Sequence, residues 1–128
     1  MPLSLIGYLV VAGLLVLGGF QAAIALGAPV GRAAWGGRNP GRLPANLRVA
    51  SAVSVVVYLV FAVIVLDRIG MPVIDIPDPL AQAGTWVLVL LLTVGTVLNL
   101  ASSSPYERFG WAPFAAVMAL LTLVIAAS

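Results

Sequence analysis

The chain has 128 residues, of which 62% are hydrophobic and only 8% are charged. Soluble domains carry about 25% charged residues, and a chain of this size cannot bury so much apolar surface in one water-facing globule. The composition therefore excludes an ordinary soluble domain and indicates that lipid solvates most of the chain. Cys and His are absent, which removes thiolate and imidazole metal ligands and histidine proton relays.

Four charge-poor apolar runs predict four transmembrane helices, because about 20 apolar residues cross the hydrocarbon core. The runs cover approximately residues 3–28, 49–66, 85–100 and 111–127. The first run is too long for the apolar core of a signal peptide and lacks a basic segment before it, so we expect it to be a span. The sequence thus predicts one integral membrane domain over residues 1–128, an all-α bundle of four transmembrane helices.

The connections between these runs differ in charge. Four of the six arginines lie in or at the end of the first connection, and the third contains one more, Arg108. The second contains only Arg68 as a basic residue. The positive-inside rule therefore predicts that the first and third connections are cytoplasmic and that both termini face outward. The Ala-, Val-, Gly- and Arg-rich composition without Lys suggests a GC-rich bacterial source, and hence the inner (plasma) membrane.

The first and third connections share Pro, Arg and Trp at identical spacing, in the pairs Pro29/Pro105, Arg32/Arg108 and Trp35/Trp111. One interpretation is a parallel repeat of two helical hairpins related by an axis along the membrane normal. The other is convergence, because Pro ends helices while Arg and Trp favour the cytoplasmic interface. The sequence leaves both open.

Small residues recur at four-residue spacing on the predicted helices. Gly19, Ala23 and Gly27 share a face of the first helix, and Gly95 shares a face of the third with Asn99. Small residues at this spacing let helices approach closely. We expect packing within the bundle, with a homodimer face or a docking face for a larger complex as the alternative.

Two primary amides, Gln21 and Asn99, lie in the predicted spans on the cytoplasmic side. An amide in hydrocarbon is costly unless it is paired. The favoured interpretation is that the two amides bond each other or free carbonyls and join helices; the alternative is that they line a small polar cavity. No ionisable residue lies deep in a span, whereas proton-coupled carriers usually keep one there.

The cytoplasmic arginines and a tryptophan form the best candidate binding surface. Basic side chains at headgroup level attract anionic lipid at about 1 kcal/mol each. We expect lipid or a partner protein to be bound by Arg32, Trp35, Arg38, Arg42, Arg48 and Arg108. The alternative is that these arginines only orient the protein in the membrane and bind lipid non-specifically. Glu107 is expected to pair with Arg32 or Arg108 and so to hold the two connections together.

Catalytic chemistry is not indicated. Asp75 and Asp78 could hold a divalent cation with water, but a solvated acidic loop explains them better, and we expect no metal or cofactor. The run Ser102–Ser104 has no histidine or buried lysine to activate a nucleophile. The sequence therefore predicts no catalytic residue and no enzyme.

Two segments carry a resemblance to known proteins. They are Ala34-Trp35-Gly36-Gly37 with Leu43-Pro44 and Leu47-Arg48, and Asn99–Pro105 with Glu107-Arg108 before Trp111. By these motifs the chain resembles small uncharacterised bacterial integral membrane proteins with four helices. The resemblance covers nearly the whole chain. The resemblance implies the fold and carries no activity, ligand or catalytic residue.

Two functions remain as hypotheses. The first is a non-enzymatic membrane protein, either an accessory subunit or a scaffold that binds lipid or a partner protein. The second is a small homo-oligomeric channel or facilitator whose path is lined by helix-end dipoles, Gln21 and Asn99. Only the third helix, with Thr85, Thr93 and Thr96, approaches a polar face, and these threonines do not form one continuous stripe. No nucleic acid partner is expected, because the basic residues face a membrane surface.

Overall fold

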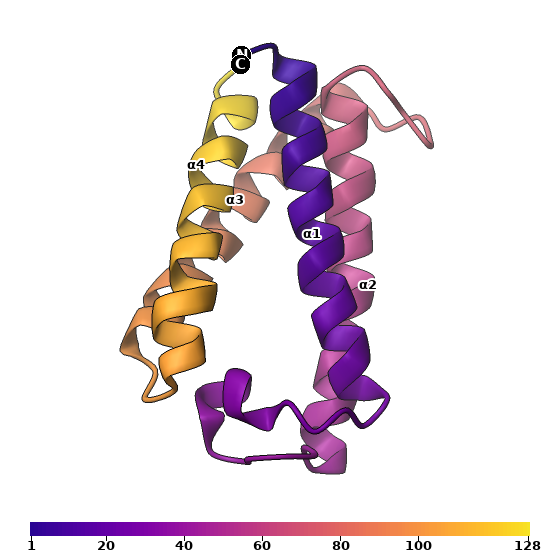
Figure 1. The fold of residues 1–128 in the computed structure, drawn as a ribbon. Coiled ribbons are helices and arrows are strands. Elements are labelled where there is room, and N and C mark those ends of the chain that lie inside the picture. The colour runs from indigo at the N-terminus through magenta and orange to yellow at the C-terminus, as the bar shows by residue number, and fades with distance from the viewer.

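The computed structural model describes all 128 residues and contains helices but no strands. Its long helices are α1 (Leu3–Ala25), α2 (Ala45–Arg68), α3 (Asp78–Ala101) and α4 (Ala112–Ala126), as Figure 1 shows. Two 3₁₀ turns, η1 (Gly31–Ala33) and η2 (Trp35–Gly37), lie between α1 and α2, and a π-helical turn, η3 (Glu107–Trp111), leads into α4. The prediction of an all-α chain with four long helices is confirmed.

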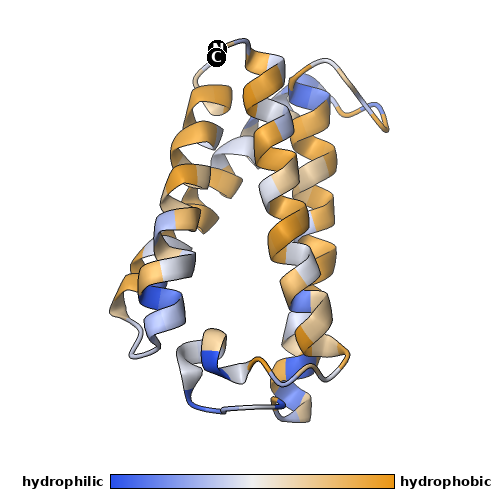
Figure 2. Cartoon of the chain, in the orientation of Figure 1, coloured by the Kyte–Doolittle hydropathy of each residue, from blue (hydrophilic) through white to orange (hydrophobic).

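All four helices, α4 together with η3, are long and apolar enough to cross a membrane. Figure 2 shows hydrophobic residues along most of each helix and hydrophilic residues concentrated near the two ends of the bundle. Large apolar side chains point outward; Leu90 and Leu120 are each more than 60% exposed. Contiguous apolar surface of this kind is unfavourable in water.

Two helix boundaries differ from the prediction. α2 begins at Ala45 and α3 begins at Asp78, so the second connection does not extend to about residue 83 as expected. The reason is that Pro is well tolerated in the first turn of a helix, where its missing N–H would have no partner. Pro79 occupies such a position in α3, and the Asp78 carboxylate complements the positive end of the helix dipole.

The helices form two antiparallel hairpins, because α1 packs mainly against α2 and α3 mainly against α4. The matching Pro, Arg and Trp positions of the two connections nevertheless adopt different backbones. Trp35 has a positive φ of 49°, whereas Trp111 is helical, with φ −68° and ψ −33°. The shared motif therefore does not recur as a structural unit.

A core contributed by all four helices fills the half of the bundle that holds the two termini. Its buried side chains are Ile6, Val10, Leu14, Ala62, Val65, Leu88, Leu92, Met118 and Ile125. At the end of α2, Arg68 Nη2 donates to the backbone oxygens of Ile125 and Ser128, at 3.1 and 3.3 Å. This places a cation at the C-terminal end of α4, where positive charge complements the helix dipole.

Close helix approach occurs at glycines other than the predicted ones. A side chain at Gly13 would overlap Met118, and one at Gly7 would lie within 2.7 Å of Ile69. Gly19 and Gly95 instead face open space, and Gly27 lies beyond the end of α1 with φ +97°. The prediction that these last three glycines pack helices together within the chain is wrong. Ala23 is half-buried in α1.

Candidate functional site

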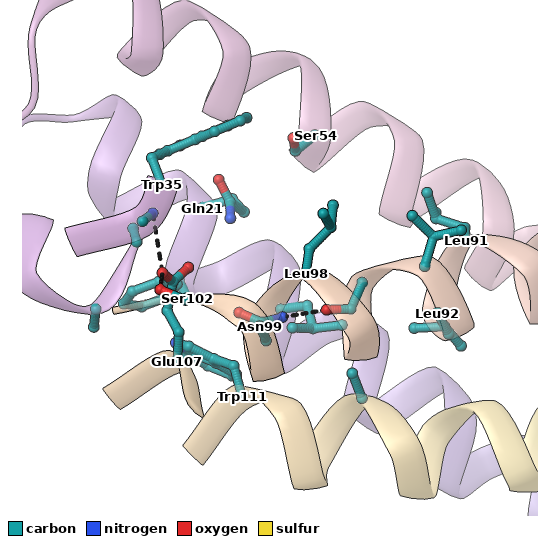
Figure 3. Close-up of a pocket in the computed structure, with 18 of the residues that line it drawn as sticks. Gln21, Trp35, Ser54, Leu91, Leu92, Leu98, Asn99, Ser102, Glu107 and Trp111 are labelled. Atoms are coloured by element: carbon teal, nitrogen blue, oxygen red, sulfur yellow. Dashed lines mark hydrogen bonds between the residues drawn. The ribbon is translucent and has the colours of Figure 1, made fainter. Parts of the chain in front are cut away.

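A cavity of about 530 Å³ lies between the two hairpins, in the half of the bundle that the core does not fill. All four helices and η2 contribute to its wall, and 12 of its 19 lining residues are hydrophobic. Figure 3 shows Gln21 and Trp35 on one side, and Asn99, Ser102 and Glu107 on the other. Mostly apolar walls with a few polar groups are typical of small-molecule sites of this volume.

Glu107 is the one charged residue in the cavity wall, and only 9% of its surface is exposed. Its Oε1 accepts hydrogen bonds from the Gly36 N–H at 2.9 Å and from Ser102 Oγ at 2.7 Å (Figure 3). The predicted ion pair with Arg32 or Arg108 does not form: both arginines are exposed, whereas Glu107 is buried and bonds other groups. Glu107 does join the first and third connections, but through neutral donors.

Two serines strengthen this junction. Ser104 Oγ donates to the carbonyl oxygen of Arg32, and Ser103 Oγ donates to that of Gly36 at 3.4 Å. Together with the Glu107 bond, they hold η1 and η2 against the start of η3, beside the cavity. The first and third connections therefore lie at the same end of the bundle, as Figure 1 also shows.

Trp35 adopts a backbone conformation that residues other than glycine seldom adopt. Its φ of 49° is positive, and such positions persist only where surrounding contacts hold them. One contact is the hydrogen bond from Trp35 Nε1 to Ser51 Oγ on α2, at 3.0 Å. Ser51 is completely buried. This bond fixes the indole at the cavity wall.

Replacing Trp35 with phenylalanine should lower the free energy of unfolding by about 1–2 kcal/mol, because buried Ser51 loses its donor. Thermal unfolding in detergent, followed by circular dichroism, measures the change. Trp86→Phe is the matched control, since Trp86 is 44% exposed and its indole N–H bonds no protein group. Equal melting temperatures for the two variants would contradict a structural role for the Trp35–Ser51 bond.

The π-helical turn η3 places two chemically different side chains in the cavity wall. Its first residue is Glu107 and its last is Trp111, and both line the cavity. The Trp111 ring packs against Phe20 of α1 with ring centroids 4.7 Å apart, and edge-on against Phe114 at 5.7 Å. Single π-helical turns are frequent at functional sites, and no local sequence signal predicted this one.

The favoured prediction was that the two amides bond each other or free carbonyls and so join helices, and the structure shows no such bond between helices. Asn99 Nδ2 donates to the Gly95 carbonyl of its own helix at 2.8 Å (Figure 3), and Gln21 Oε1 is buried without any hydrogen-bond partner. Both residues line the cavity. Their position corresponds to the alternative interpretation, in which the amides border a polar cavity.

The threonines of α3, which come nearest to a polar face on that helix, bond their own helix. The hydroxyls of Thr85, Thr93 and Thr96 each donate to the carbonyl four residues earlier, at 2.7–2.8 Å. None of the three lines the cavity.

The predicted basic surface lies outside the cavity. Arg32, Arg38, Arg42 and Arg108 are exposed, and none of the chain's arginines contributes to the cavity wall. Arg48 is half-buried, and its Nε donates to the Ala25 carbonyl at the end of α1, at 3.2 Å. Trp35 is the only member of the predicted surface that lines the cavity.

The acidic residues Asp75 and Asp78 are exposed, and no cluster of three or more His, Cys, Asp or Glu residues could hold a metal ion. The fold is thus a bundle of four apolar helices with a cavity between its two hairpins. Comparisons with family models, with curated proteins and with solved structures find no match to this chain.

Proposed function

We propose that this chain is a non-enzymatic integral membrane protein that binds an amphiphilic molecule in the cavity between its hairpins. The observation that carries the proposal is the composition of the wall. Apolar residues surround most of a space of about 530 Å³, while Ser102 and Glu107 lie where the two connections meet. An amphiphile bound there would place its hydrophobic body between the helices and its polar end at the connections.

The membrane location is supported by the four apolar helices and their outward-facing leucines. Five of the six arginines lie at the end of the bundle formed by the first and third connections. By the positive-inside rule, that end is cytoplasmic and both termini are external. The exposed arginines would then also contact anionic headgroups of the inner leaflet.

The proposed topology predicts the labelling of introduced cysteines, and the chain has no native cysteine to interfere. In intact cells, Val73→Cys should react with a membrane-impermeant maleimide, while Pro40→Cys should react only after the membrane is permeabilised. Both positions are exposed in connections, so accessibility within the fold is matched. Reversed labelling would invert the topology, and labelling of neither position after permeabilisation would contradict these connections being outside the bilayer.

A binding role fits the cavity better than conduction does. The core of nine buried residues, which includes Leu92 at the cavity wall, fills the other half of the bundle. The cavity therefore ends at this core and does not continue to the end of the bundle that holds the termini. A site closed at one end can retain a molecule but gives it no path across.

Quenching of tryptophan fluorescence tests cavity binding directly. In a Trp86→Phe background the remaining tryptophans, Trp35 and Trp111, both line the cavity. The protein is placed in nanodiscs of neutral lipid, and the probe is an uncharged alkyl alcohol with bromine at the far end of its chain. We expect saturable quenching at low mole fractions of probe, above the level that the same probe gives with free tryptophan derivatives in lipid.

Two glycine substitutions provide a matched pair. Gly95 lines the cavity and Gly19 does not, and a side chain at either position meets open space. Gly95→Leu should therefore fill the cavity and abolish saturable quenching, whereas Gly19→Leu should leave it unchanged. Quenching that is unsaturable, or equal in both variants, would refute binding in the cavity.

A further inference from the structure

We infer that the cavity selects a cationic amphiphile whose ammonium group is bound by the Glu107 carboxylate and the surrounding aromatic rings. The inference rests on the proposed function, because it specifies the ligand of the same cavity. The shared chemistry is an ammonium group on a hydrophobic body. Either a free lipophilic amine or the ethanolamine headgroup of a lipid could supply it.

The first observation is a negative charge that the protein does not neutralise. Glu107 is nine-tenths buried, and no arginine lines the cavity or forms an ion pair with it. Burying a carboxylate is costly unless a cation or several donors compensate it. Both donors that the protein supplies go to Oε1, which leaves Oε2 free to accept a hydrogen bond from a ligand.

The second observation is an acceptor without a donor. Gln21 lines the same cavity, and its Oε1 is buried with no hydrogen-bond partner. Buried polar atoms are paired in the great majority of cases, so an orphaned acceptor beside a cavity indicates that the donor comes from outside the chain. An ammonium group has up to three donors and no acceptor, which matches a site that presents oxygens.

The third observation is the aromatic content of the wall. Phe20, Trp35, Tyr58 and Trp111 all line the cavity, and Phe20 packs directly on Trp111. The faces of aromatic rings carry negative partial charge and attract cations, most strongly in sites away from water. The charge, the acceptor without a donor and the aromatic content of the wall thus favour the same ligand class, and they disfavour an anion.

The experiment compares three bromine-tailed probes of equal chain length, in the Trp86→Phe protein in neutral nanodiscs. The probes are an alkylammonium, an alcohol and a carboxylate, each compared at equal mole fraction in the membrane. We expect half-maximal quenching by the ammonium at a mole fraction at least tenfold lower than by the alcohol, and the carboxylate to be the weakest. Equal affinities, or stronger binding of the carboxylate, would overturn the inference.

Glu107→Gln separates charge from structure, because its amide oxygen can still accept from the Gly36 N–H. This variant should lose the preference for ammonium, so that the half-maximal mole fractions of the ammonium and the alcohol differ by less than about twofold. A preference that persists in Glu107→Gln would overturn the role of Glu107. If Glu107→Gln does not fold, the ratio between the three probes in the original chain still decides the charge preference.

Two further results distinguish failure of cavity binding from failure of the ammonium preference, and a lipid ligand from a free amine. If even the alcohol shows no saturable quenching that Gly95→Leu removes, the proposed function fails and the inference fails with it. If the alcohol binds and the ammonium has no advantage, only the inference fails. A bromine-tailed ethanolamine lysophospholipid that matches the free amine would support a lipid source, and a tenfold weaker one would support a free amine.

Discussion

Replacing Gly31 with alanine should prevent most of the protein from reaching its folded state. A Cβ at this position would overlap the carbonyl oxygen of Asn39 and lie 2.7 Å from that of Gly41. The Gly31 N–H also donates to the Gly41 oxygen at 2.8 Å, so these two parts of the first connection are already in contact. Because the obstructing atoms belong to the backbone, no side-chain rotation relieves the overlap. We expect a loss of about 3 kcal/mol or more.

Recovery from size-exclusion chromatography and thermal unfolding in detergent measure this loss. The control is Gly19→Ala, because a Cβ there meets open space on α1. That variant should be unchanged or more stable by up to about 1 kcal/mol, since alanine is the better helix former. If Gly31→Ala unfolds at the same temperature as Gly19→Ala, the tight fold of the first connection is incorrect.

Replacing Glu107 with alanine should separate the first and third connections. The change removes the acceptor for the Gly36 N–H and for Ser102 Oγ, and hydrogen bonds to a charged group contribute about 1.5–3 kcal/mol each. Water can reach the loosened segment and recover part of that energy, so we expect a net loss of about 2–3 kcal/mol in the free energy of unfolding. The exchange of the Gly36 amide hydrogen should accelerate in parallel.

Two control variants, Glu107→Gln and Asp75→Ala, are compared with Glu107→Ala. Glu107→Gln keeps an acceptor and should lose less stability than the alanine variant. Asp75→Ala removes an exposed carboxylate that accepts no hydrogen bond, and should change stability by less than about 0.5 kcal/mol. An alanine variant at position 107 that matches Asp75→Ala, with unchanged exchange at Gly36, would contradict the junction between the connections.

The number of helices could be predicted from composition and run length, because uninterrupted apolar stretches admit few other structures. The boundaries of these helices were harder to predict. Asp78 and Pro79 favour a loop by residue type, yet the same residues suit the first turn of a helix, and only the rest of the fold decides between these outcomes. Close packing was placed on the wrong glycines, since periodic spacing identifies a face without showing what that face contacts.

The cavity could be predicted only in part. Gln21 and Asn99 were identified because amides are rare in apolar runs, but their bonding depends on which helices adjoin them. Glu107 was expected to find an arginine, as surface carboxylates often do. Its burial depends on the π-helical turn of η3 and on the positive φ of Trp35, and neither has a sequence signal of its own. Non-local geometry therefore created the site.

The uneven distribution of packing along the bundle has a mechanical consequence. The half that holds the termini is joined by interlocking side chains from all four helices. In the other half the hairpins surround a cavity, and they are joined by hydrogen bonds between connections and by the Phe20–Trp111 contact. Regions with few buried apolar contacts open locally at lower free energy than a packed core. The molecule is therefore stiff at one end and compliant at the other. The lifetime of a molecule held between the hairpins would be governed by how often these few hydrogen bonds and the Phe20–Trp111 contact break together.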